Sequence, residues 1–153
     1  MNSAPSAPEI RIRPAESGDL SEIVALYREL NPDDDSLSSE IAGHAFAALL
    51  AHPGLTVFVG LDGECAVATA TLNVIPNLTR NARPYAIIEN VVCLTSHRGR
   101  GFGKAVVTHA IKAAWEAGCY KTMLLTGRTD AAVHRFYEGC GFVQNKTGYQ
   151  IRR

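Results

Sequence analysis

A glycine-rich turn is the clearest chemical signal in the sequence. Three glycines alternate with basic residues in the stretch SHRGRGFGKAVV, residues 96–107, which continues into an alanine- and valine-rich run. Glycine lets the main chain approach a ligand without an intervening Cβ, and the first N–H groups of a helix attract anions. We therefore expect this turn to bind a phosphate group, with added positive charge from Arg98, Arg100 and Lys104.

The surroundings of the turn exclude the familiar phosphate-binding motifs. A dinucleotide-binding fingerprint would lie in the first strand-to-helix turn of a parallel unit, whereas this turn comes late in the chain, after a hairpin pattern. A Walker A loop would place Ser or Thr after its lysine, but Lys104 is followed by Ala105. An arginine-glycine segment for nucleic acid would be longer and disordered. Taken alone, the turn could also simply reverse the chain.

Hydrophobic periodicity predicts the elements that must position this turn. Pro32 ends the first expected helix, and Asp62-Gly63 is a typical two-residue hairpin turn between two alternating strands. The stretch AIIENVVCL reads as a central strand buried on both faces. The expected elements are, in order, strand 10–14, helices 17–30 and 41–50, strands 55–61, 64–75 and 86–94, helix 102–118, strand 121–126, helix 130–139, and a last strand pair around 142–143 and 149–152.

This order predicts an α/β protein with one mixed, largely antiparallel central sheet flanked by helices. The chain has 153 residues, of which 46% are hydrophobic, which is enough for one core and short for two. We expect a single domain over residues 9–153. Residues 1–8, rich in Ser, Ala and Pro, are expected to form a flexible tail.

The bulk composition narrows the class of partner. The formal net charge is zero, so neither nucleic acid nor an anionic membrane is an expected partner. The four cysteines are far apart, without zinc-finger spacing, which predicts reduced thiols, no metal site and a cytoplasmic protein. No stretch reads as a membrane span or a signal peptide.

Three separated motifs, taken together, resemble the GNAT superfamily of acetyl-CoA-dependent N-acetyltransferases. They are the spacing Arg98-x-x-Gly101-x-Gly103, the preceding strand IENVVCL and the downstream stretch HRFYEGCGF, and the resemblance covers roughly residues 9–153. The segments IENVV, GCYK, FYEGCGF and YQIRR are most similar to the glucosamine-phosphate N-acetyltransferases. The resemblance implies a GNAT fold and acetyl-CoA as cosubstrate, with no metal.

The resemblance also implies how acetyl-CoA is held. Main-chain N–H groups of residues 99–104 would cradle the diphosphate, and the strand before them would pair with the two amides of the pantetheine arm. A main-chain N–H near Val92 would stabilise the oxyanion. The implied coenzyme-binding residues are Val91, Val92, Cys93, Leu94, Arg98, Gly99, Arg100, Gly101, Phe102, Gly103 and Lys104.

Two residues are expected to move protons. Glu89 is an ionisable side chain in an otherwise apolar strand, where a buried carboxylate is a usable base, although it could instead be salt-bridged or face solvent. Tyr137 matches the family tyrosine that protonates the leaving thiolate, although it also lies on an apolar helix stripe. His134 is an alternative base. Cys93 and Cys140 lack a paired base, so we expect them to be small buried hydrophobes.

The expected acceptor is the primary amine of a small molecule, such as an amino sugar phosphate. Candidate substrate residues are Glu89, Asn90, Arg80, Arg83 and Arg128, with Lys146 in addition, although the basic residues could simply be solvated charges. Similar enzymes tend to carry Asp where Asn90 stands. The resemblance also implies a homodimer. Two alternatives stay open: an acetyltransferase that modifies proteins, and a non-catalytic acyl-CoA sensor.

Overall fold

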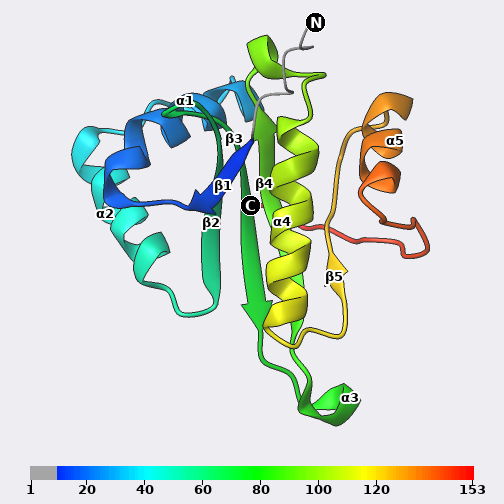
Figure 1. Cartoon of the computed structure of the whole chain (residues 1–153). Coiled ribbons are helices and arrows are strands. Elements are labelled where there is room, and N and C mark those ends of the chain that lie inside the picture. Colours follow the sequence, from blue (N-terminus) through cyan, green and yellow to red (C-terminus); the bar gives the residue numbers. More distant parts are fainter. Residues whose placement is uncertain (1–9) are drawn as a thin grey trace, which may run out of the picture.

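A five-stranded sheet in the order β1-β2-β3-β4-β5 forms the centre of the protein (Figure 1). This computed structural model describes residues 10–153, so the expected tail over residues 1–8 lies outside the described residues. The first four strands pair antiparallel, and β5 pairs parallel to β4. The predicted mixed, largely antiparallel sheet is therefore confirmed. The strands are β1 (Arg11–Pro14), β2 (Leu55–Asp62), β3 (Cys65–Ile75), β4 (Tyr85–Cys93) and β5 (Thr122–Met123).

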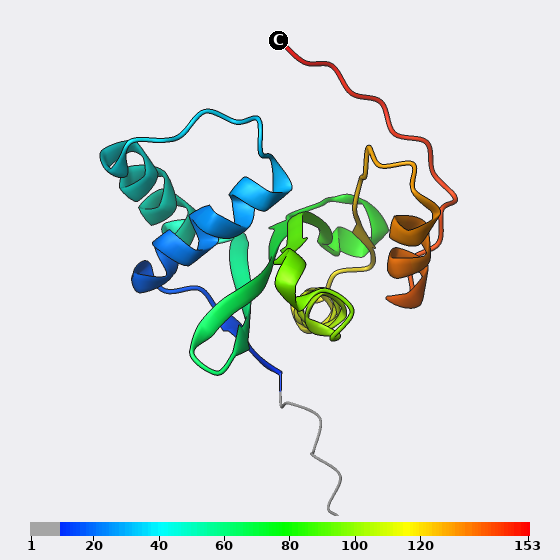
Figure 2. The ribbon, with the colours of Figure 1, turned by 90° about the horizontal axis from the view of Figure 1, so that it is seen from above.

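Helices cover both faces of the sheet, as the view from above shows (Figure 2). Helices α1 and α2 pack on one face, and α4 packs on the other. The first two correspond to the predicted helices 17–30 and 41–50. The helices are α1 (Leu20–Leu30), α2 (Ser39–Ala51), α3 (Thr79–Ala82), α4 (Phe102–Glu116) and α5 (Ala131–Gly139), with single 3-10 turns η1 (Ser17–Asp19) and η2 (Thr95–His97).

The core consists of two clusters, one on each face of the sheet. Successive side chains of a strand point to opposite faces, so Val57 and Val59 of β2 pack under α1 and α2, whereas Phe58 packs under α4. Within the described chain, no helix has the length and apolar character needed to cross a membrane.

The hairpin between β2 and β3 turns one residue later than expected. Asp62 pairs with Cys65, so the two turn residues are Gly63 and Glu64 instead of Asp62 and Gly63. Gly63 has a φ of 61°, a left-handed conformation that glycine adopts without strain. The shift leaves the Asp62 side chain at the end of a strand, where it contacts the glycine-rich turn.

The predicted C-terminal strand pair is wrong. Residues 142–153 form no helix or strand, and β5 is limited to two residues of the predicted strand 121–126. Because β4 and β5 separate after two paired positions, the chain beyond β5 has no neighbouring strand with which to bond. The C-terminal segment instead runs away from the body of the protein (Figure 2). It carries exposed apolar side chains at Val143, Tyr149 and Ile151.

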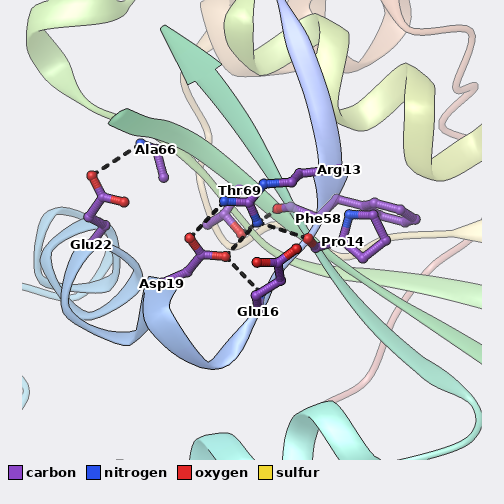
Figure 3. A network of polar contacts seen from close by, with 8 residues as sticks. All are labelled: Arg13, Pro14, Glu16, Asp19, Glu22, Phe58, Ala66 and Thr69. Atoms are coloured by element: carbon purple, nitrogen blue, oxygen red, sulfur yellow. Dashed lines mark hydrogen bonds and ion pairs between the residues drawn. The ribbon is translucent and has the colours of Figure 1, made fainter. Parts of the chain in front are cut away.

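An ion pair fastens the start of α1 to the first strand (Figure 3). Arg13 donates to both carboxylate oxygens of Asp19, at 2.6 and 2.9 Å, and the main-chain N–H of Glu16 donates to Asp19 at 2.7 Å. Farther along α1, Glu22 accepts from the main-chain N–H of Ala66 at 3.3 Å. These contacts tie α1 and the turn before it to the edge strand β1 and to the central strand β3.

We expect Asp19→Asn to lower the free energy of unfolding by about 2 to 3 kcal/mol at pH 7. Asp19 is buried, and its replacement leaves the Arg13 guanidinium without a charged partner. For a chain of this length the melting temperature should fall by about 4 to 12 °C. Urea titration monitored by circular dichroism would measure the loss. The exposed pair between Arg11 and Glu64 provides the control, because Glu64→Gln should change stability by less than about 1 kcal/mol.

The same pair predicts a pH dependence. The hydrogen bonds from Arg13 hold the pKa of Asp19 below its ordinary value, against the opposing effect of burial. A carboxylate with a lowered pKa stabilises the fold fully above its unfolded pKa of about 3.9 and loses that contribution as the pH falls through the folded pKa. The stability difference between the wild type and Asp19→Asn should therefore persist at pH 7 and shrink below about pH 4. An equal difference at pH 7 and pH 3 would contradict this origin.

Candidate active site

The glycine-rich turn presents unpaired main-chain N–H groups at the start of α4. Gly99 and Gly101 have φ angles of 73° and 90°, which turn the chain sharply into the helix. Among residues 10–153, no hydrogen bond uses the main-chain N–H of Gly99, Arg100 or Gly101. The first N–H groups of α4 add to them, because a helix leaves its first turn unbonded. The turn can therefore donate several hydrogen bonds to one anion.

Gly103 lies where three elements meet. A Cβ at this position would lie 3.5 Å from the ring of Phe136 in α5 and 3.8 Å from the Cβ of Cys93 at the end of β4. The third glycine thus allows close packing behind the turn, whereas Gly99 faces open space. Of the predicted coenzyme-binding residues, Phe102 is buried in the core, so it supports the turn from below.

The arginines of the turn bond to the protein itself. Arg98 donates from Nε to the carbonyl oxygen of Cys93 at 3.2 Å, and Arg100 donates from Nη2 to Asp62 at 3.0 Å. Lys104 instead lines a hollow along α4 together with His109 and Lys112. Lysine side chains therefore extend the positive surface beyond the turn.

Strand β4 has an open edge beside the turn. Its pairing with β5 ends where Ile87 lies opposite Met123, and no other strand of residues 10–153 pairs with the rest of β4 on that side. Val91 to Cys93 lie in this unpaired part, two to four residues before the η2 turn. An extended ligand with amide groups could add to this edge as a strand does.

A β-bulge distorts β4 at the same point. Val92 lies opposite Thr69 and Glu89 opposite Thr71, so Asn90 and Val91 together face the single residue Ala70. Asn90 has a φ of 51°, a conformation that asparagine tolerates better than most residues. The bulge re-aims the main chain next to Val92, where the resemblance places the oxyanion.

The expected burial of Glu89 is wrong. Its side chain is exposed, and so is that of Asn90, although Ile88 before them and Val92 after them are buried. Glu89 pairs across the sheet with Thr71, so both side chains lie on the same face. The Thr71 hydroxyl lies 3.4 Å from the hydroxyl of Tyr27 in α1, which identifies this as the α1 face. Glu89 is thus a carboxylate open to an incoming amine.

Tyr137 is half-buried in α5 and packs on Phe136 and Phe142, with ring centroids 5.1 and 6.1 Å away. Burial raises the pKa of Tyr137 above its ordinary value, and the nearby charges of Cys140 and Glu89 raise it further. The phenol therefore keeps its proton at neutral pH. Glu89 and Tyr137 are close enough for the charge of one to affect the pKa of the other.

The other candidates near α5 have structural contacts. His134 shares a hydrogen bond of 3.1 Å between Nε2 and the carbonyl oxygen of Arg128. Burial raises the pKa of the Cys93 and Cys140 thiols, which favours the neutral thiol over a nucleophilic thiolate. Within residues 10–153, no three His, Cys, Asp or Glu side chains gather closely enough to hold a metal ion.

The candidate acceptor residues are divided between two places. Arg80 and Arg83 lie in the α3 loop at the far end of β4, where Arg83 donates to the carbonyl oxygen of Cys119 at 3.4 Å. Glu89 is four residues beyond the start of β4, about 13 Å along the strand. One chain therefore does not bring these two arginines to Glu89. Arg128, which pairs with Asp130 at 2.9 Å, precedes α5 and lies near Tyr137.

Sequence reasoning missed two carboxylates that contact the turn. Glu29 of α1 accepts from Thr95, and Asp62 at the end of β2 accepts from Arg100. The two contacts join residues that are separated by 66 and by 38 positions in the sequence, so a local sequence pattern does not predict them. The bulge at Asn90 had a weak signal, since asparagine in a strand interior is unfavourable and tolerates a left-handed conformation.

Comparison with known proteins identifies the family of this chain. Residues 20–142 match the profile of the acetyltransferase (GNAT) family. The glucosamine 6-phosphate N-acetyltransferase of Trypanosoma brucei brucei is 31% identical over 134 residues, which cover 88% of this chain and 89% of that protein. Glucosamine 6-phosphate N-acetyltransferase 1 of Oryza sativa subsp. japonica is 33% identical over 144 residues, with coverage of 88% and 81%.

A solved structure from Agrobacterium tumefaciens str. C58, an acetyltransferase-like protein, is 61% identical with a TM-score of 0.91, covering 94% of this chain and 99% of that one. The resemblance seen in the glycine-rich turn and its flanking motifs is thereby confirmed. The chain belongs to the GNAT family, and it is an acetyl-CoA-dependent acetyltransferase.

Proposed function

We propose that the protein transfers the acetyl group of acetyl-CoA to the primary amine of a small molecule, with an amino sugar phosphate as the favoured acceptor class. The observation that carries this proposal is the adjacency of the N–H-rich turn to the open, bulged edge of β4. Similarity of 31% and 33% to two glucosamine 6-phosphate N-acetyltransferases supports the acceptor class. We place this activity in a single domain over residues 9–153.

The turn and the strand edge divide the work of binding. Main-chain N–H groups from Gly99 to Lys104 donate to the diphosphate, and helix α4 adds its positive end. The main chain of Val91 to Leu94 pairs with the amides of the pantetheine arm, which would otherwise be buried unpaired. A main-chain N–H near Val92, re-aimed by the bulge, stabilises negative charge on the carbonyl oxygen.

Two side chains move protons in the proposed reaction. Glu89 accepts the proton of the attacking amine, directly or through water, as the N–C bond forms. Tyr137 donates its phenolic proton to the sulfur as the S–C bond breaks. Because Glu89 is exposed, it can release the accepted proton to solvent. The raised pKa of Tyr137 keeps its hydroxyl group protonated before each turnover.

The test is an assay of thiol release from acetyl-CoA with a panel of amines. We expect turnover with glucosamine 6-phosphate and lower kcat/KM with glucosamine, because a basic side chain such as Arg128 would bind the phosphate. Activity confined to peptides would instead indicate an enzyme that modifies proteins. Raising of the melting temperature by acetyl-CoA, without turnover of any amine, would indicate a sensor.

We also propose that the protein forms a homodimer in the cytoplasm. The C-terminal segment supports a second copy as its binding partner, because Tyr149 and Ile151 are 94% and 97% exposed in one chain. The four free cysteines are compatible with a reducing compartment. In a dimer, Arg80 and Arg83, which are distant from Glu89 of their own chain, could contribute to the active site of the partner subunit.

Light scattering coupled to size exclusion checks this arrangement. The wild type should have twice the chain mass of 16.5 kDa. The double variant Tyr149→Asp, Ile151→Asp should shift toward the single-chain mass, because two carboxylates would have to be buried at the contact. A wild type that stays at the single-chain mass at every concentration would refute the dimer.

A further inference from the structure

Glu29 contacts Thr95, near the start of the segment that joins β4 to α4 and contains the glycine-rich turn. Its Oε2 accepts from the main-chain N–H of Thr95 and from the Thr95 hydroxyl, both at 2.8 Å, and lies 3.9 Å from Nη2 of Arg98. Donation by Thr95 lowers the pKa of Glu29, so the side chain is charged at neutral pH. One carboxylate at the last turn of α1 thus fixes both a main-chain group and a side chain of the segment.

Asp62 contacts His97 and Arg100, which lie farther along the same segment. Its Oδ2 lies 3.0 Å from Nη2 of Arg100 and 3.4 Å from Nε2 of His97. The Arg100 guanidinium also lies 5.2 Å from the ring centroid of Phe102, and the His97 ring lies 5.8 Å from it. Since Phe102 is 1% exposed, the two basic side chains rest on the fixed core while Asp62 bonds to them.

Side-chain contacts of Glu29 and Asp62 help to fix the position of the segment between β4 and α4. The last residue of β4 is Cys93, and α4 begins at Phe102. Between them, Leu94 still donates its main-chain N–H to the carbonyl oxygen of Val67 in β3 at 2.9 Å, whereas within the described chain the residues after Leu94 in this segment have only local main-chain bonds and side-chain contacts. Glu29 and Asp62 hold four of the eight residues between β4 and α4, at positions 95, 97, 98 and 100. The two left-handed glycines, 99 and 101, lie within and just after this held stretch.

We propose that Glu29 and Asp62 are positioning residues for acetyl-CoA, which hold the turn in the conformation that presents its N–H groups to the diphosphate. The inference rests on the proposed function and extends it to two side chains that need not touch the ligand. A turn that is ordered before binding avoids the entropy cost of ordering it during binding. The arginines then act mainly as the links between carboxylates and turn.

A different role for Asp62 makes the opposite prediction. If Arg100 bound the diphosphate directly, Asp62 would only compete for its charge, and removal of the carboxylate would tighten binding. If Asp62 positions the turn, its removal weakens binding although the protein becomes more positive. The sign of the change in affinity therefore separates the two roles.

The experiment compares Glu29→Ala and Asp62→Ala with the wild type. We expect the Kd for coenzyme A, measured by calorimetry, to rise about three- to tenfold in each variant, corresponding to one loosened contact. KM for acetyl-CoA should rise by the same factor, with kcat unchanged. With S-acetylpantetheine, which lacks the diphosphate, kcat/KM should stay the same.

Glu64→Ala is the matched control. Glu64 lies two residues after Asp62 in the same hairpin, but it pairs with Arg11 of β1 at 3.0 Å instead of with a residue of the glycine-rich turn. Its Kd for coenzyme A should equal that of the wild type. If only Glu29→Ala and Asp62→Ala raise the Kd, the effect comes from the contacts with the turn and not from the loss of a surface ion pair in general.

Three results would overturn the inference. An unchanged or lower Kd in both variants would leave the proposed function standing but remove the positioning role. An equal loss of kcat/KM with S-acetylpantetheine would show general damage to the site. A wild type that binds no coenzyme A would instead refute the proposed function itself, and the inference with it.

Discussion

Gly101→Ala is expected to raise the Kd for coenzyme A by about 10- to 100-fold. Gly101 has a φ of 90° and a ψ of −4°, which an L-residue adopts only with strain of about 1 to 3 kcal/mol. The chain would relieve the strain by rotating the turn, and its N–H groups would no longer converge on one anion. Calorimetric titration with coenzyme A measures the effect, since each factor of ten in Kd is about 1.4 kcal/mol.

The substitution acts through the backbone and not through lost space. The nearest atom to an added Cβ at Gly101 is the Cδ1 of Ile10 at 3.7 Å, an ordinary contact. Gly43→Ala is the control, because Gly43 lies in α2 with nothing within 4 Å of the added Cβ. That variant should bind coenzyme A normally and be slightly more stable, by about 0.5 to 1 kcal/mol. Equal affinity in both variants would exclude the turn as the binding site.

Tyr137→Phe is expected to lower kcat by about 100-fold at neutral pH. General acid catalysis contributes a factor of about 10² to 10⁴, and the lower end applies because a thiol of pKa about 8.5 is a tolerable leaving group. KM for acetyl-CoA should change little, since Phe fills the same space between Phe136 and Phe142. Steady-state assays of thiol release measure both constants.

The pH profile distinguishes an acid from a packing residue. Because the pKa of Tyr137 is raised by burial, its proton stays in place up to alkaline pH, and the wild type should keep its advantage over the variant there. Tyr85→Phe, at the start of β4, should leave kcat unchanged and serves as the control. Turnover by Tyr137→Phe at the wild-type rate across the pH range would remove the acid from the mechanism.

Local patterns predicted the elements and the turn because both depend on neighbouring residues. The helix over α4 and its glycine N-terminus follow from periodicity and from the tolerance of Gly101 for a positive φ. The stretches LTVFVGL and ECAVATATLNVI likewise predicted an antiparallel pair of strands, which the structure contains as β2 and β3. In these cases the residue types alone carry the physical reason for the structure.

The failures came where a contact between distant segments decides the outcome. The exposure of Glu89 depends on which parts of the sheet the helices cover, which the apolar stretch AIIENVVCL does not reveal. The C-terminal strands failed because alternating residues such as Tyr149 and Ile151 need a partner strand before they can form a sheet. The roles of Glu29 and Asp62 depend on a helix end and a hairpin that fold against the turn.

Because β5 ends early, the unpaired edge of β4 offers main-chain N–H and C=O groups to a ligand. Any residue contributes the same N–H and C=O to such an edge, apart from proline. In the proposed binding mode, the cosubstrate therefore constrains the path of the main chain more than the identity of its side chains. We expect substitutions along this strand that preserve the path of the main chain to retain the acyl donor, even where they change the acceptor.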